Sequence, residues 1–224
     1  MGGVSNTAIG GNALSGAAID NNVAIGKNAL VSSTWSEVTA VGAFSLDANT
    51  SGVRNTALGY SSLSAIVTAN DSTAVGYNAL LLDTGGSNTA VGSGAGDAIT
   101  TGFSNVVIGL NALGALTTSA YNLAVGNGAL GTTTSTTNYD TAIGYNALIG
   151  IQGGDNSVGL GAFAGSLIST GDNNIVIGYQ AGNNITTGST NLIIGYDIDA
   201  PSATASGQLS LGNLIFGTSL GEQG

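Results

Sequence analysis

The sequence is built from one short unit that returns about every 17 residues along almost the whole chain. The stretch Asn6-Thr-Ala-Ile-Gly10 returns as Asn55-Thr-Ala-Leu-Gly59 and again as Asn88-Thr-Ala-Val-Gly92. A repeat of this length predicts that each unit is one small structural element that stacks on the next, as in a solenoid. Counting weaker copies, we place a repeat glycine at Gly10, Gly26, Gly42, Gly59, Gly76, Gly92, Gly109, Gly126, Gly144, Gly159, Gly178, Gly195 and Gly212.

The composition of each unit favours strands over helices. Glycine recurs inside every apolar segment and β-branched residues dominate these segments, and both features disfavour a helix. Most units continue after the glycine with Asn-Ala-Leu, as in Asn12-Ala-Leu14, and then run into a polar loop. We therefore predict an all-β parallel β-solenoid, or β-roll, whose unit is strand, glycine bend, short strand and polar loop. About 13 coils stacked at the spacing of neighbouring strands give a rod of roughly 60 Å. Residues 1–206 form the repeat region, and residues 207–224 form the last coil and a tail.

The order of residues in the predicted strands indicates an oligomer. The residue before the repeat glycine is always Ile, Val or Leu, and the residue before that is usually Ala, as in Ala8-Ile9. Neighbours on a strand point to opposite faces, so both faces are expected to be buried. The second predicted strand repeats the pairing, as in Ala79-Leu80. A lone solenoid covers only one face of its strands, so further copies must cover the other. We expect a homotrimeric rod.

The composition argues against most catalytic and nucleic-acid-binding functions. The 224 residues include no His and no Cys, which removes the imidazole base, the thiolate nucleophile and the usual zinc and haem ligands. Lys27 and Arg54 are the only basic residues and the net charge is −10, which disfavours nucleic acid and anionic membranes as partners. No apolar run approaches the roughly 20 residues of a membrane span. We expect no enzymatic activity, no cofactor and no metal.

Several aromatic residues are candidate contacts for a ligand or a partner. We expect Tyr60 to stack on Tyr77, and Tyr179 on Tyr196, in consecutive coils. Exposed aromatic ladders bind sugars or proteins, but they also pack neighbouring strands, and we favour packing. Trp35 lies in the polar insert 32–36, where contact with a ligand or a neighbouring chain competes with packing inside the loop. The tyrosines that follow a repeat glycine are Tyr60, Tyr77, Tyr145, Tyr179 and Tyr196.

Two sets of polar residues also repeat. We interpret the Asn four residues before the glycine as a stacked amide ladder rather than a ligand site. Asp155, Asp172, Asp197 and Asp199 offer the oxygen ligands that calcium takes, but the calcium-roll pattern Gly-Gly-x-Gly-x-Asp is absent, so we predict no calcium site. The predicted ladder consists of Asn6, Asn22, Asn55, Asn88, Asn105, Asn122, Asn174 and Asn191.

The units resemble known fibre repeats. The core Ala8-Ile-Gly-Gly-Asn-Ala13 resembles the head repeats of trimeric autotransporter adhesins of the Yersinia-adhesin type. The longer form, seen at 72–80 and 140–148, resembles repeats of phage tail fibres and related bacterial surface fibres. The stretch 208–218 resembles the segment that often precedes an endosialidase-type intramolecular chaperone in such fibres. The resemblance covers about residues 4–217, although the period near 17 is longer than that of the adhesin heads.

The resemblance implies three left-handed parallel β-rolls side by side and a role in adhesion. We accordingly expect the shaft or head of a trimeric tail fibre or surface adhesin, extracellular, on a virion or a bacterial cell surface. Its partners would be its own copies, other fibre segments, and a host-surface glycan or protein receptor. The alternative is a structural filament subunit that assembles end to end into extracellular fibres, since uncapped solenoid ends can associate.

Overall fold

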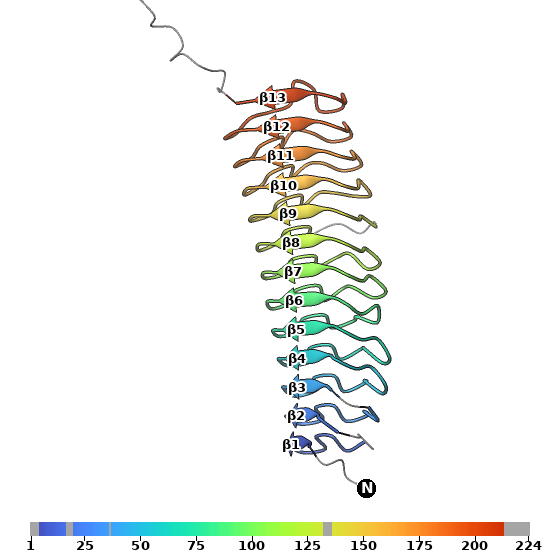
Figure 1. The fold of residues 1–224 in the computed structure, drawn as a ribbon. Coiled ribbons are helices and arrows are strands. Elements are labelled where there is room, and N and C mark those ends of the chain that lie inside the picture. The colour runs from blue at the N-terminus through green and yellow to red at the C-terminus, as the bar shows by residue number, and fades with distance from the viewer. Residues whose placement is uncertain (1–4, 17–19, 36, 132–135, 213–224) are drawn as a thin grey trace, which may run out of the picture.

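The computed structural model describes residues 5–16, 20–35, 37–131 and 136–212, and in these residues it is a single stack of thirteen short strands (Figure 1). All thirteen strands lie in one parallel sheet in chain order, and each pairs in register with the next. This confirms the predicted all-β solenoid with a repeat of about 17 residues. The strands are β1 (Thr7–Ile9), β2 (Val23–Ile25), β3 (Thr39–Val41), β4 (Thr56–Leu58), β5 (Thr73–Val75), β6 (Thr89–Val91), β7 (Val106–Ile108), β8 (Leu123–Val125), β9 (Thr141–Ile143), β10 (Val158–Leu160), β11 (Ile175–Ile177), β12 (Leu192–Ile194) and β13 (Leu209–Leu211). The predicted last coil therefore continues the same sheet, and residues 213–224 of the predicted tail lie outside the described residues.

A glycine follows the strand because the backbone there needs a conformation that few other residues adopt. Gly26 has a φ of 134°, and the equivalent glycines from Gly10 to Gly195 have φ values between 128° and 145°. The coils also approach closely at this point. A Cβ atom on Gly26 would lie 2.6 Å from the carbonyl oxygen of Gly42 in the next coil. Both constraints exclude a side chain.

One of the thirteen predicted bend glycines is wrong. Gly159 is the middle residue of β10, where it pairs with Ala142 and Val176. The bend glycine of this coil is Gly161, with a φ of 133°. β10 has glycine where most strands have alanine, so two glycines follow Val158 and only the second, Gly161, is the bend. Of the other twelve, only Gly212, after β13, is not in the positive-φ region.

The second predicted strand is also wrong, because this segment is a tight turn. Asn28, with φ 58°, and Leu30, with φ 52°, lie in the left-handed region, and similar pairs recur in most coils. With a left-handed residue on either side of it, Ala29 does not alternate with Leu30 as strand residues do. Ala29 and Leu30 are both fully buried inside the same coil. Their burial within one chain therefore carries no evidence for a partner chain.

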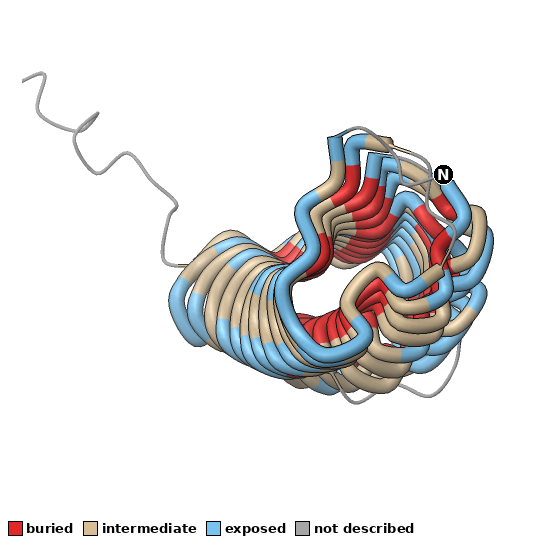
Figure 2. Tube along the Cα trace, turned by 90° about the horizontal axis from the view of Figure 1, so that it is seen from below, coloured by how far each residue is buried: buried red, intermediate tan, exposed pale blue. Residues whose placement is uncertain are grey.

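The buried residues line the inside of the coils (Figure 2). The middle residue of each strand points inward and is usually alanine, such as Ala57 and Ala124, while the turn contributes leucines such as Leu80 and Leu113. The space between them is narrow, because a Cβ atom on Gly159 would lie 2.6 Å from Cγ of Leu148. The solenoid thus fills its interior with small residues from the strand and large ones from the turn.

The first and third residues of each strand point outward and form a continuous surface, which we term the outer sheet face. None of these strand residues is charged. We predicted that both faces of the strands are buried. In a single chain only the inner face is buried, and the outer sheet face is uncovered. The third-position row is Ile9, Ile25, Val41, Leu58, Val75, Val91, Ile108, Val125, Ile143, Leu160, Ile177, Ile194 and Leu211. The first-position row is Thr7, Val23, Thr39, Thr56, Thr73, Thr89, Val106, Leu123, Thr141, Val158, Ile175, Leu192 and Leu209.

Candidate functional site

The tyrosines that follow the bend glycine form short ladders, as predicted for two pairs. The rings of Tyr60 and Tyr77 stack with centroids 5.6 Å apart, and those of Tyr179 and Tyr196 stack at 5.2 Å. Tyr145 instead makes a T-shaped contact with Phe163, with ring centroids 5.1 Å apart. The five tyrosines are between 40% and 75% exposed. Within each stacked pair each ring covers one face of the other, so that face is closed to a ligand.

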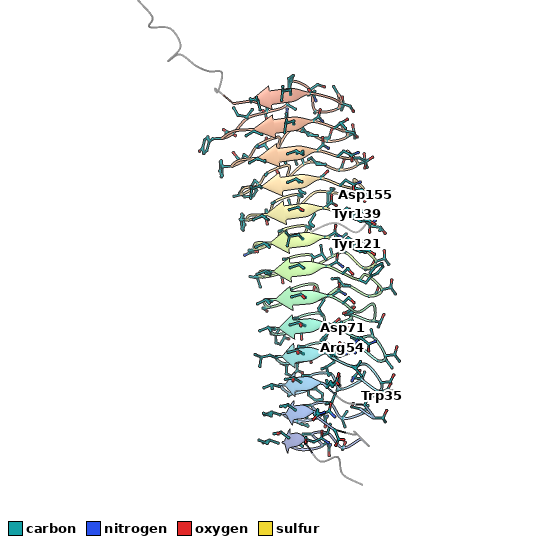
Figure 3. The ribbon with its side chains drawn as sticks, viewed as in Figure 1. Trp35, Arg54, Asp71, Tyr121, Tyr139 and Asp155 are labelled. Carbon is teal, nitrogen blue, oxygen red and sulfur yellow. The ribbon has the colours of Figure 1, made fainter. Side chains whose placement is uncertain are left out.

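A second aromatic column was missed in the sequence. Phe103 packs edge-on against Tyr121 at 5.1 Å, and Tyr121 stacks on Tyr139 at 5.0 Å with an interplanar angle of 5°. Both tyrosines have φ near 60°, at the same place in the coil as Arg54 and Asp71 further down the rod (Figure 3). The available signal was the constant separation of 18 residues between these three aromatics.

Trp35 stands half exposed on a loop that the backbone holds in place. Its side chain is 52% exposed. Its carbonyl oxygen accepts a hydrogen bond from Nδ2 of Asn22 at 3.0 Å and another from Oγ of Ser33 at 3.4 Å. The loop is therefore fixed through its main chain, and the indole is left accessible to a neighbouring chain or a ligand.

The buried amide ladder is confirmed and has a structural role. Asn105 accepts a hydrogen bond on Oδ1 from the backbone N–H of Asn122 at 3.0 Å. Its Nδ2 donates to the carbonyl oxygen of Ser119 at 2.8 Å and to Oδ1 of Asn88 at 3.1 Å. Each such side chain thus links its own coil to the next and satisfies a loop carbonyl inside the protein. The fully or almost fully buried members are Asn22, Asn55, Asn88, Asn105, Asn122, Asn174 and Asn191.

Asp83 is a buried carboxylate that sequence reasoning missed. Its Oδ1 accepts hydrogen bonds from the backbone N–H groups of Gly85 and Gly86 and from Nδ2 of Asn88, at 2.9 to 3.3 Å. Its Oδ2 accepts one from Oγ of Ser72 at 3.2 Å. Burial raises the pKa of Asp83, and these four hydrogen bonds oppose the rise because they favour the charged form. Asp83 therefore closes a loop rather than facing a ligand.

Asp140 takes the place of asparagine in the amide ladder. Its Oδ1 accepts the backbone N–H of Ser157 at 2.7 Å, as an amide oxygen would. Its Oδ2 and the Oγ1 of Thr137 are buried close to each other, and neither atom has another hydrogen-bond partner among the described residues. Burial raises the pKa of Asp140 to about 7, with smaller contributions from the charges of Asp155 and Asp172. The signal was visible in the sequence, because Asp140 replaces the first Asn of the repeated pentapeptide.

The other candidate acids make local contacts. Oδ1 of Asp155 accepts the backbone N–H of Asn138 at 2.7 Å, and Oδ1 of Asp172 accepts that of Asp155 at 3.0 Å. Neither Asp197 nor Asp199 is part of a possible metal-binding group, because the described residues contain no cluster of three or more His, Cys, Asp or Glu side chains.

Arg54 and Asp71 form an exposed ion pair. Nε of Arg54 lies 2.6 Å from Oδ1 of Asp71, and Nη2 donates to Oδ2 at 2.9 Å. The hydrogen bonds from Arg54 lower the pKa of Asp71, and the hydrogen bonds to Asp71 raise the pKa of Arg54. One of the two basic groups of the protein is therefore already paired.

The part of the chain that the structure describes has surfaces rather than a cleft. Those residues form no pocket that would enclose a small molecule. None of them belongs to a helix with the length and hydrophobicity of a membrane span. The features that remain for recognition are the outer sheet face, the aromatic columns and Trp35.

Comparisons of this chain with protein-family models, with curated proteins and with solved structures find no match.

Proposed function

We propose that this protein is a structural and adhesive fibre component, the shaft or head of a trimeric tail fibre or surface adhesin. In this proposal three copies lie side by side with their outer sheet faces toward one another. The rod spaces binding surfaces away from an anchor, and three parallel copies raise avidity without raising the affinity of a single site. We place the assembly outside the cell, on a virion or a bacterial surface, and we propose no catalytic activity for it.

The uncovered outer sheet face is the observation that carries the proposal. It runs along all thirteen strands, and its third-position row consists only of Ile, Val and Leu. Leu58 and Leu160, in the lower and upper parts of the stack, are 48% and 42% exposed in a single chain. Continuous exposed apolar surface is rare on monomeric proteins and marks an interaction surface.

The absence of charge on the outer sheet face favours another copy as the occupant. Each chain carries a net charge of −10, so two copies repel one another unless they meet through an uncharged surface. The rows of side chains also repeat at the strand spacing of about 4.8 Å. A second solenoid has rows of the same period, so contacts made at one coil are repeated at the next. The number three comes from the resemblance to trimeric fibres.

Receptor contact is proposed for the exposed aromatic residues. Trp35 and the five tyrosines lie on accessible surface, and aromatic side chains of this kind contribute large contact areas to sugars and proteins. A host-surface glycan or a protein receptor is the proposed partner. Only Lys27 and Arg54 carry positive charge, which leaves nucleic acid without a binding surface.

An end-to-end filament is the second candidate. Strands β1 and β13 each pair with only one neighbour, so each has an edge of backbone groups within the described sheet. Such edges can pair with another chain and extend the stack. This filament would grow along the rod axis, whereas the trimer associates sideways.

Mass measurement and electron microscopy separate the two candidates. Light scattering after size exclusion should give a mass near three times 21.6 kDa that does not change on dilution. A stable monomer of 21.6 kDa would contradict the trimer. Micrographs should show short rods of roughly 60 Å, the length expected for thirteen stacked strands. Long unbranched fibres from the same sample would instead favour the filament.

A further inference from the structure

The outer sheet face changes character halfway along the rod. In β1 to β6 the first-position row is threonine in every strand except β2, and in β7 to β13 it is apolar in every strand except β9. The third-position row is apolar throughout. We term the two parts the N-terminal half face (β1–β6) and the C-terminal half face (β7–β13).

The two half faces therefore present different surfaces to a partner. On the C-terminal half face two apolar rows run side by side, and in β7 both outward residues, Val106 and Ile108, are about 40% exposed. On the N-terminal half face a single apolar row runs beside a row of hydroxyl groups. Valine has nearly the shape of threonine, whereas the isoleucine and the leucines of this row are larger, so the C-terminal half face is both less polar and bulkier.

Both differences make the C-terminal half face the stronger surface for association. Burying an apolar group is favourable in proportion to its area, whereas a buried hydroxyl must find a hydrogen-bond partner or lose free energy. A facing copy gains from both rows at Val158, Ile175 and Leu192. It gains from only one row at β3 to β6.

A second copy of this chain is the partner that can match the outer sheet face along its full length. The face is free of charge on a chain of net charge −10, and its rows repeat at the strand spacing that another copy shares. A partner without this period would match a few coils and then lose register. The change from hydroxyl to apolar side chains then makes the interface weaker along β1–β6 and stronger along β7–β13.

We propose that copies of this protein are held together mainly through the C-terminal half face, and that the N-terminal half face contributes a weaker contact. This inference rests on the self-association in the proposed function, and it specifies where that association is strongest. The C-terminal halves would hold the assembly together, and the N-terminal halves would separate more readily.

A matched pair of substitutions in the full chain tests the proposal. Leu58→Lys in β4 and Leu160→Lys in β10 change the same residue type in the same row, at nearly equal exposure. Around Leu58 the threonine hydroxyls Thr56 and Thr73 can accept hydrogen bonds from an ammonium group. Around Leu160 the neighbours in the first-position row are Val158 and Ile175, which cannot.

Sedimentation equilibrium gives the dissociation constant of the assembly. We expect Leu160→Lys to raise it at least about tenfold more than Leu58→Lys does, a difference of about 1.4 kcal/mol. Circular dichroism should show that both variants keep the β-structure, because both side chains point away from the interior. Equal effects of the two substitutions, or a larger effect of Leu58→Lys, would overturn the proposal.

A gain-of-interface variant provides the reverse test. The triple change Thr39→Val, Thr56→Val and Thr73→Val gives β2 to β5 two apolar rows, with only Thr89 of β6 between them and the C-terminal half face. Association should tighten, and Leu58→Lys in this background should weaken it about as much as Leu160→Lys does. An unchanged dissociation constant would count against the role of the first-position row.

Measurements on the wild-type protein distinguish a failure of this inference from a failure of the proposed function. A wild-type chain that is monomeric at every concentration contradicts the proposed self-association itself. A wild-type oligomer that is insensitive to the position of the lysine contradicts only the unequal halves.

Discussion

The two faces of the same three-residue strands carry opposite kinds of apolar residue. The inner face has alanine at most positions and is buried from β2 to β12, while the third-position row of the outer face has only Ile, Val and Leu and is partly exposed in one chain. The usual expectation puts the bulky residue inside. The solenoid reverses it because leucines from the turns, such as Leu80, already fill the interior. Residue size in this fold therefore reports the space available on each face rather than the depth of burial.

The largest effect is expected from placing a bulky residue on the inner face. Ala124→Leu forces a large side chain into a close-packed interior where Ala124 is fully buried. Overpacking of this kind costs about 3 kcal/mol or more, which corresponds to roughly 10 °C in Tm for a chain of this size. The neighbouring Val125→Leu, on the outer sheet face, is the control and should leave Tm nearly unchanged. Thermal melts followed by circular dichroism measure both, and equal losses would mean that the two faces do not differ in available space.

Removing one side chain of the buried amide ladder should cost somewhat less. Asn105→Ala leaves the backbone N–H of Asn122 and the carbonyl oxygen of Ser119 without their partners. A buried polar group that loses its hydrogen bond costs about 1–3 kcal/mol, so we expect Tm to fall by about 5–8 °C. Asn127→Ala, on the exposed part of the neighbouring turn, provides the control. A loss no greater than that of the control would show that the ladder is not needed inside the coil.

A pH-dependent stability should mark the one ladder position that holds an acid. Because the pKa of Asp140 in the folded chain is about 7, above that of an unfolded carboxyl group near 4, the folded chain keeps this proton between those values. The free energy of unfolding therefore falls as pH rises from about 4 to about 7, and stays low above this window. Asp140→Asn supplies an amide that needs no proton. It should match the wild type near pH 4 and exceed its Tm at pH 8 by several degrees, because each unit of pKa difference is about 1.4 kcal/mol of stability.

The control for Asp140→Asn removes an equal charge at an exposed position. Asp172 lies outside the interior, and its Oδ1 accepts a backbone hydrogen bond that an amide oxygen can also accept. Asp172→Asn should leave most of the pH dependence in place. If Asp140→Asn melts with the same pH dependence as the wild type, the buried carboxyl group of Asp140 does not control stability in this range.

The repeat was sufficient to predict the stack, and to predict its register in every coil except that of β10, where Gly159 stands inside the strand. It was not sufficient to predict the turn. In Asn28-Ala-Leu30 the alternation of side chains resembles a strand, and only the left-handed φ of Asn28 and Leu30 turns both Ala29 and Leu30 inward. The asparagine was a hint, since it tolerates this conformation better than most residues. The left-handed leucine had no such signal.

Parts of the candidate site were hidden for related reasons. The tyrosine ladders at Tyr60 and Tyr179 followed from equal spacing after a glycine. The second column at Tyr121 and Tyr139 lies before the strand, where the repeat is degenerate. The role of Asp140 depends on burial, which the sequence does not state. The direction of the bulky strand residues depends on which other side chains fill the interior, and that is a property of the assembled coil.

The smallest effect is expected on the outside of the rod, at the ion pair between Arg54 and Asp71. Both side chains are about half exposed, so water and salt screen their attraction. Arg54→Gln should leave Tm unchanged within error, in contrast to the changes inside the coils. The informative control is the ionic strength, since wild type and variant should melt together at both low and high salt. A clear loss of Tm that salt removes would mean that this charge pair joins the two coils more tightly than its exposure indicates. In that case an exposed pair would contribute to the stability of the coils, which the other predictions assign to the buried residues alone.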